Sequence, residues 1–235
     1  MKTTVVEILQ ETPSTRTVRF AKPKNFTYHP GQFIMLNLLH PQPDDRGTRR
    51  SLSLSSSPTE GFLQITTREG TSSFKQTLHQ LKIGTDVDLL GPMGRFLLNE
   101  DAQTPAILLA GGIGATPFRS MLTHLAHTQS TKPVTLLFSN KKPDDIVFHN
   151  HFVDISRESK YIDVINTITD TESLNDSYSG KRGRINEEMI QTVSYWKQAE
   201  YYLCGPIVMV SALQEVVKSL GISEERIKTE QFSGY

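Results

Sequence analysis

Along the first hundred residues, short runs rich in β-branched and apolar positions are separated by Pro, Gly, Asn and Asp. Such runs, bounded by turn-forming residues, are typical of β-strands. Phe74, Leu78 and Leu81 recur at helical spacing and predict one helix over 73–81. This half of the chain is therefore predicted to form a small antiparallel barrel. Its expected strands are 4–9, 15–20, 32–38, 50–54, 62–67 and 86–90.

The pattern changes near residue 100. The run 106–110 is apolar throughout, as in a strand that is buried on both faces. Strands that alternate with helices indicate a parallel α/β sheet. A polar stretch over 99–104 gives the expected boundary, so the predicted domains are 1–99 and 100–235. The second domain is expected to add strands 134–138, 161–168 and 201–203, and helices 117–126, 149–156, 187–193 and 208–220.

Composition narrows the classes of function. The chain of 235 residues carries 25 basic and 25 acidic side chains, so no net field attracts nucleic acid or an anionic membrane. No apolar run approaches the roughly 18 residues of a membrane span, and the N-terminus lacks the apolar core of a signal peptide. The one cysteine, Cys204, excludes an intramolecular disulfide and a cluster held by about four thiolates. With one cysteine and no signal-peptide core, the chain is expected to be cytoplasmic. The histidines lack cysteine or carboxylate partners at ligand spacing, so we expect no metal site.

Two predicted strands end in glycines. The first is followed by Gly111-Gly112-Ile113-Gly114-Ala115-Thr116-Pro117, and the second ends at Cys204-Gly205-Pro206. Glycine lets the backbone turn sharply and approach a ligand closely, and Pro117 suits the first turn of a helix. Free amides at such a turn can face a pyrophosphate. The pair predicts a nucleotide held across the carboxyl edge of a parallel sheet, although a tight turn without a ligand is the simpler alternative for either segment alone.

The barrel half contains two further segments with polar chemistry. Arg50-Ser51-Leu52-Ser53 offers a guanidinium for a phosphate and a hydroxyl for a ring edge, or is an ordinary strand with Leu52 inward. Gly70-Thr71-Ser72-Ser73 opens the predicted helix. There Ser72 or Ser73 is an N-cap, and a capped helix start also suits a phosphate.

These segments, in this order and over nearly the whole chain, resemble the plant-type ferredoxin–NADP reductase superfamily. Its members join an antiparallel flavin-binding β-barrel to a parallel α/β nucleotide-binding domain. The matching segments are 50–53, 70–73, 91–96, 112–117, 204–206 and 230–235. The resemblance implies FAD as cofactor, NAD(P)H as hydride donor, an FAD-binding domain over 1–99 and an NAD(P)-binding domain over 100–235.

The resemblance also implies roles for individual residues. Ser53 and Cys204 would lie on either side of the hydride transfer, Glu230 would share their hydrogen-bond network, and Tyr235 would cover the flavin, with Phe232 as its rival. The residues implied to bind FAD are Arg50, Ser51, Leu52, Ser53, Thr66, Gly70, Ser72, Ser73 and Phe232. Those implied to bind the nicotinamide nucleotide are Gly111, Gly112, Gly114, Thr116, Pro117, Ser139, Asn140, Lys141, Cys204, Gly205 and Pro206.

Leu52 departs from the family pattern, which usually has Tyr or Phe at this position. Leucine has no π face, and ring stacking is worth about 0.5–1.5 kcal/mol beyond area burial. The departure keeps open an alternative function, a non-catalytic FAD-binding subunit or sensor of a larger complex. The second half of the chain keeps the segments implied to bind the nicotinamide nucleotide, which favours a catalytic function.

The predicted function is therefore an NAD(P)H-dependent flavoprotein reductase. Lys141 and Lys142 follow a strand end, where they can pair with a 2′-phosphate, but Asp144 and Asp145 follow closely, so the choice of NADH or NADPH stays open. The chain has neither the cysteines nor the length for a fused iron–sulfur or haem domain. A separate acceptor is expected: a ferredoxin, a flavodoxin, an oxygenase component, a free flavin or a ferric chelate. The oligomeric state is left open.

Overall fold

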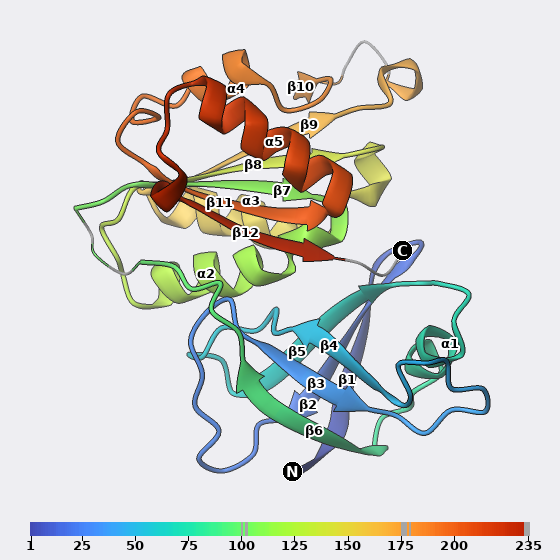
Figure 1. Cartoon of the computed structure of the whole chain (residues 1–235). Coiled ribbons are helices and arrows are strands. Elements are labelled where there is room, and N and C mark those ends of the chain that lie inside the picture. Colours follow the sequence, from blue (N-terminus) through green and yellow to red (C-terminus); the bar gives the residue numbers. More distant parts are fainter. Residues whose placement is uncertain (100, 102, 175–177, 179, 233–235) are drawn as a thin grey trace.

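The computed structural model describes residues 1–99, 101, 103–174, 178 and 180–232. Within these residues the backbone forms two six-stranded sheets. The first is antiparallel and barrel-like, and the second is parallel, so the predicted fold class is confirmed. Figure 1 shows the antiparallel sheet below the parallel one, with the helix α2 (Thr116–His127) between them.

The antiparallel sheet has the strand order β4-β3-β6-β1-β2-β5. Its one α-helix among the described residues, α1 (Ser73–His79), lies between β5 and β6 in the chain, as the spacing of Phe74 and Leu78 predicted. Both of these side chains are buried in the barrel core. The strands are β1 (Lys2–Thr12), β2 (Thr15–Ala21), β3 (Phe33–Asn37), β4 (Arg49–Ser53), β5 (Phe62–Arg68) and β6 (Asp86–Met93).

The parallel sheet has the strand order β10-β9-β8-β7-β11-β12. In Figure 1, α2 and α3 cover the face toward the barrel, whereas α4 and α5 cover the opposite face. The strands are β7 (Ala106–Gly111), β8 (Val134–Asn140), β9 (Ile162–Ile168), β10 (Lys181–Arg182), β11 (Glu200–Pro206) and β12 (Ile227–Phe232). The other helices are α3 (His149–Glu158), α4 (Glu187–Gln191) and α5 (Ile207–Ser219).

Strand β12 was not predicted from the hydrophobic pattern. It reads Ile-Lys-Thr-Glu-Gln-Phe, and four of its six residues are polar. It pairs in parallel with β11 at the edge of the sheet, so β11 satisfies backbone hydrogen bonds along one side of the strand, and of its six residues only Ile227 is buried. The pairing places Glu230 opposite Cys204, which brings two predicted site residues onto neighbouring strands.

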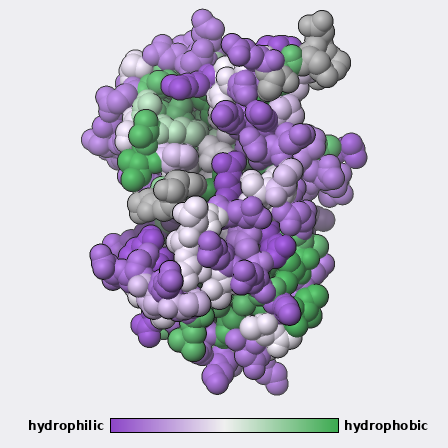
Figure 2. All heavy atoms as spheres, turned by 90° about the vertical axis from the view of Figure 1, so that its right-hand side faces the viewer, coloured by the Kyte–Doolittle hydropathy of each residue, from purple (hydrophilic) through white to green (hydrophobic). Residues whose placement is uncertain are grey.

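The core has a part on each side of the parallel sheet. Every residue of β7 is buried, with Leu108 in the cluster under α2 and α3, and Leu109 in the cluster under α5. This matches the prediction of a strand buried on both faces. No helix among the described residues combines the length and apolar character needed to cross a bilayer. Figure 2 shows a mainly hydrophilic surface on one side, with hydrophobic residues in separate small groups.

Candidate active site

A cleft of about 670 Å³ lies where the two sheets meet. Strands β3, β4 and β5 and helix α1 supply its barrel side, whereas the start of α2 and the end of β12 supply the other. Segments that are far apart in the sequence thus line one cavity. The predicted site residues that line it are Arg50, Ser51, Leu52, Ser53, Thr66, Ser72, Thr116, Glu230 and Phe232.

The cleft is strongly cationic. Among its described lining residues there are five basic side chains, and Glu230 is the one acid. Such a lining favours an anionic ligand, and the guanidinium groups can bind phosphate oxygens in pairs. Sequence reasoning identified one of the five, Arg50. The others are Arg46, Arg49, Arg68 and Lys75.

Arg50 is held in place by the loop that precedes β4. Its guanidinium donates to the Gly47 carbonyl at 2.9 Å, pairs with Asp44 at 2.7 Å and lies 5.0 Å from the centre of the Phe74 ring. Hydrogen bonds from Arg46 hold the pKa of Asp44 at about 2, well below its usual range, so Asp44 is ionised at neutral pH. An anionic ligand would therefore compete with Asp44 for Arg50.

Ser72 caps helix α1. Its hydroxyl accepts the backbone N–H of Lys75 at 3.3 Å, and Ser73 is the first helical residue. Gly70 precedes the helix, and the Lys75 side chain comes within 2.4 Å of the position that a Cβ on Gly70 would take. Ser72 thus serves as the N-cap and also lines the cleft, so the two interpretations of this segment are compatible.

The uncharged wall of the cleft is mostly apolar. Leu52 is half-buried on β4 and packs against the barrel core, beside Ile34 of β3 in the register. Phe33, Met35 and Phe74 complete this wall. The cleft therefore has an apolar side that suits a planar ring and a basic side that suits phosphates.

Ser53 and Glu230 meet across the junction between the sheets. The Ser53 hydroxyl donates to the Glu230 carboxylate at 3.4 Å, although 177 positions separate the two residues. Burial raises the pKa of Glu230 to about 7, because the charged form is poorly solvated there. A carboxyl group with this pKa holds or releases a proton near neutral pH, as a proton-transferring side chain needs to do.

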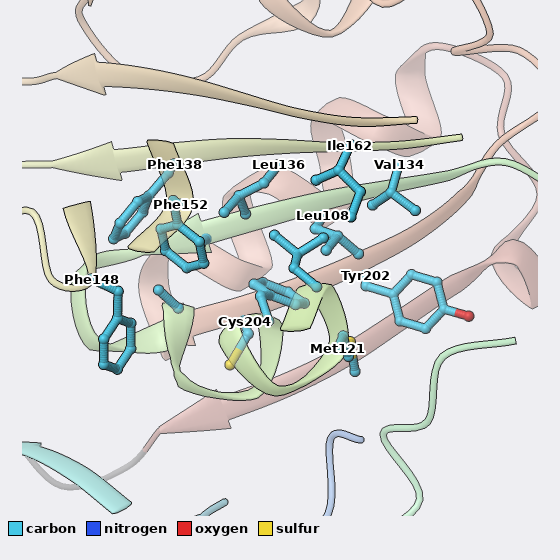
Figure 3. Close-up of a cluster of buried hydrophobic side chains, with 14 of the residues drawn as sticks. Leu108, Met121, Val134, Leu136, Phe138, Phe148, Phe152, Ile162, Tyr202 and Cys204 are labelled. Atoms are coloured by element: carbon cyan, nitrogen blue, oxygen red, sulfur yellow. The ribbon is translucent and has the colours of Figure 1, made fainter. Parts of the chain in front are cut away.

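Cys204 lies deeper than the sequence suggested. It was expected to fall in the site and not in the core, but its side chain is 0% exposed and belongs to the core cluster under α2. Figure 3 shows its sulfur among the labelled aromatic and aliphatic side chains, pointing away from the sheet. Burial and the nearby Glu230 raise the pKa of the thiol, so Cys204 is a neutral thiol. Its predicted contact with a nicotinamide ring stays a prediction.

The glycine turn after β7 packs against the end of β11. It forms a short 3₁₀ helix, Gly112–Ala115, that leads directly into α2, with Pro117 in the first turn. Gly112 has φ +51°, and a Cβ on Gly114 would lie 2.3 Å from the Cys204 carbonyl oxygen. Glycine is needed at both positions, the first for its conformation and the second for close packing.

Arg68 links the two halves of the site. It ends β5 in the barrel, yet its Nη2 lies 3.1 Å from the position that a Cβ on Gly112 would take. The cationic group therefore lies over the glycine turn, on the side facing the cleft. Sequence reasoning missed Arg68, because nothing local marks a strand end as the neighbour of a turn 44 positions away.

The other predicted nucleotide residues lie outside the cleft lining. Ser139, Asn140 and Lys141 follow one another at the carboxyl end of β8, with Lys141 exposed and Asn140 buried. Within the described part of the chain, the Asn140 amide has no hydrogen-bond partner. Tyr235 lies outside the described residues. The remaining predicted residues outside the lining are Gly70, Ser73, Gly111, Gly112, Gly114, Pro117, Cys204, Gly205 and Pro206.

Comparisons with known proteins match both halves of the chain. Residues 2–97 match the oxidoreductase FAD-binding domain, and residues 108–215 match the oxidoreductase NAD-binding domain. A glycine betaine monooxygenase reductase subunit from Pseudomonas aeruginosa is 28% identical over 97% of this chain and 63% of its own length. A flavohemoprotein from Halalkalibacterium halodurans is 25% identical over 97% of this chain and 59% of its own. The chain thus spans about three-fifths of these curated relatives.

Solved structures share the fold. A cytochrome P450 reductase from Amycolatopsis superposes with a TM-score of 0.83 at 25% identity, covering 99% of this chain and 70% of that one. A ferredoxin NADP+ reductase from Neisseria gonorrhoeae with bound FAD and NADP gives 0.81 at 19% identity, covering 98% of both chains. The chain thus matches an oxidoreductase FAD-binding domain followed by an oxidoreductase NAD-binding domain, and its fold is similar to that of ferredoxin NADP+ reductase.

Proposed function

We propose that this protein is an NAD(P)H-dependent reductase that holds FAD in the cleft and passes electrons to a separate acceptor. One observation carries the proposal. A single cleft combines five basic side chains with the Ser53–Glu230 hydrogen bond at the junction of an FAD-binding and an NAD-binding domain. We propose 99/100 as the domain boundary, since the matched domain models end at 97 and begin at 108.

The lining residues fit FAD. The pyrophosphate carries negative charge, for which Arg50, Arg49, Arg46 and Lys75 offer donors, and Ser72 also lines the cleft. The isoalloxazine ring is planar and largely apolar, and Leu52 and its neighbours on β3 and β4 offer a matching wall. Thr66 also lines the cleft, and its hydroxyl is held by hydrogen bonds with the hydroxyls of Thr17 and Ser55. When bound, FAD accepts a hydride from a reduced nicotinamide and can release its electrons singly.

The chain's own residues would bind and orient the nicotinamide nucleotide and would move a proton. We propose that the turn at Gly112 and Gly114 and the hydroxyl of Thr116 receive the nicotinamide nucleotide, with Ser139, Asn140 and Lys141 toward its adenosine. Glu230, with its pKa near 7, would exchange a proton through Ser53 at the ring edge.

The carboxyl end completes the site. Phe232 lines the cleft and packs on the cluster that contains Cys204, which supports a covering role for this aromatic. Tyr235 is the other candidate for that role. Cys204 would approach a nicotinamide ring only after the cover has moved.

The electron acceptor is proposed to be a separate molecule. A reductase subunit of a monooxygenase is among the relatives, which supports an oxygenase component. The alternative acceptors are a ferredoxin, a flavodoxin, a free flavin and a ferric chelate. The single cysteine supports a reducing compartment, and we propose the cytoplasm.

Anaerobic titration of the purified protein with NADH and with NADPH tests the function. The flavin absorbance should bleach with at least one of them, and the two titrations decide the preference that Lys141 and Asp144 leave open. Extraction should yield FAD. A protein that yields only FMN would contradict the cofactor, and an FAD-loaded protein that neither nicotinamide bleaches would favour the alternative of a non-catalytic FAD-binding subunit.

A further inference from the structure

A buried polar interface joins α2 to the segment that follows β4. Arg119 of α2 places Nη1 3.0 Å from Glu60 Oε2 and Nη2 3.0 Å from Glu60 Oε1, so the pair is bidentate. Nη1 also donates to the Ser55 carbonyl at 2.6 Å. The side chains of Arg119 and Glu60 are only 5% and 11% exposed. An arginine of the NAD-binding domain is thus buried in a contact with the FAD-binding domain.

Further hydrogen bonds cross the same interface. The Ser120 hydroxyl donates to the Ser56 carbonyl, one residue along from the Arg119 contact. Two turns later, His127 Nδ1 lies 2.8 Å from the Thr59 hydroxyl. The backbone N–H of Ser57 donates to Glu60 at 2.6 Å, which fixes the carboxylate on the barrel side. Helix α2 is therefore held along its length against residues 55–60.

A histidine of α3 lies beside this ion pair. His151 lies near Glu60 and Arg119, and its Nε2 is 2.8 Å from the Thr123 hydroxyl. Burial and the neighbouring Arg119 lower the pKa of His151 to about 4, so it is neutral at pH 7. The pKa of Glu60 is also lowered, against burial, by its hydrogen bond with Arg119. At neutral pH, one full positive charge faces one full negative charge.

Both ends of this contact lead directly into the cleft. Ser55 is two residues after Ser53, which faces Glu230. Arg119 is three residues after Thr116, and three helical residues span about 4.5 Å. A rotation of one domain about the other would therefore move the glycine turn relative to Ser53. A buried ion pair is weak evidence for stability, but it can specify one arrangement of the parts that it joins.

We propose that Arg119 and Glu60 form a positioning pair that fixes the angle between the two domains, and so the distance across which hydride is transferred. The catalytic half of this proposal rests on the proposed function, whereas the geometric half does not. A misplacement of about 1 Å can cost about 100-fold in rate, so a loosened angle should affect the transfer more than the binding of either nucleotide.

The test uses the FAD-loaded protein with Glu60→Gln and, separately, Arg119→Lys. The first keeps the shape but removes the charge, and the second keeps the charge but removes the bidentate geometry. Nitroxide labels at Lys24→Cys and Ala212→Cys, both exposed and one in each domain, report the distance between the domains. Native Cys204 is fully buried and should stay unlabelled. Glu7→Gln is the matched control, because Glu7 pairs with Arg19 at 2.7 Å entirely within the barrel.

We expect a narrow distance distribution for the wild type and the control, and a broader one for both variants. In stopped-flow reduction, hydride transfer should slow about 10- to 100-fold in the variants, while the FAD dissociation constant and the nicotinamide KM change by less than about threefold. Narrow distributions in both variants would overturn the positioning pair. Broad distributions with unchanged hydride transfer would overturn its catalytic consequence. A wild-type protein that no nicotinamide reduces would instead overturn the proposed function, and the distance measurement keeps the two failures apart.

Discussion

Replacing Glu230 by glutamine should change how stability depends on pH. Burial raises the pKa of this carboxyl group from 4.5 to about 7 in the folded protein. The folded state therefore holds the proton more tightly than the unfolded state does. This contribution to stability is fully present below about pH 4.5 and is lost as the pH rises through about 7. Because each pKa unit corresponds to about 1.4 kcal/mol, the loss is about 3 kcal/mol.

Glutamine cannot titrate, so the unfolding free energy of the Glu230→Gln protein should not show this loss with rising pH. Urea unfolding of both proteins between pH 4.5 and pH 8, at matched flavin content, measures the difference in unfolding free energy. Relative to the variant, the wild type should lose about 3 kcal/mol over this range, or about 6–12 °C in Tm for a chain of this size. Ser53→Ala is an informative companion, because the Ser53 hydrogen bond lowers the Glu230 pKa and its loss should move the slope to higher pH. Stability profiles of wild type and Glu230→Gln that run parallel would refute the assignment of a buried, proton-holding carboxyl group.

Three further substitutions test the cleft. Leu52→Tyr should lower the FAD dissociation constant about fivefold, since stacking adds about 1 kcal/mol, and equal or weaker binding would show that the site has repacked around leucine. Cys204→Ala should slow stopped-flow flavin reduction far more than it weakens FAD binding, whereas an unchanged rate would make Cys204 a packing residue only. Arg68→Ala should weaken binding of NAD(P)+, measured by calorimetry, more than Arg49→Ala does, because Arg68 lies over Gly112. The reverse order would assign Arg68 to FAD alone.

What the sequence predicted well depends on local chemistry. The glycine turn before α2 and the cap at Ser72 are each specified within a few residues, and the structure forms both. The contact between Ser53 and Glu230 is not local, and it was expected only from the family resemblance. Arg68 and Arg119 were not identified at all. Arg68 lies 44 positions from Gly112, and Arg119 lies 59 positions from Glu60. Nothing in the sequence around an arginine distinguishes one that faces solvent from one that contacts another domain.

Cys204 shows why a motif can be placed correctly while its side chain is not. In a half-exposed strand, alternation of apolar and polar residues tells which side chains face the core. Strand β11 is buried on both faces, so that alternation is absent from Tyr201 to Cys204. Leu203 packs under α5 and Cys204 packs under α2, and this division depends on which helix covers which face. The strand end was therefore predictable, but the depth of the thiol was not. Phe232, whose side chain was expected near the flavin, packs on the same cluster as the Cys204 thiol, so the packing of both side chains depends on how the two strands meet α2.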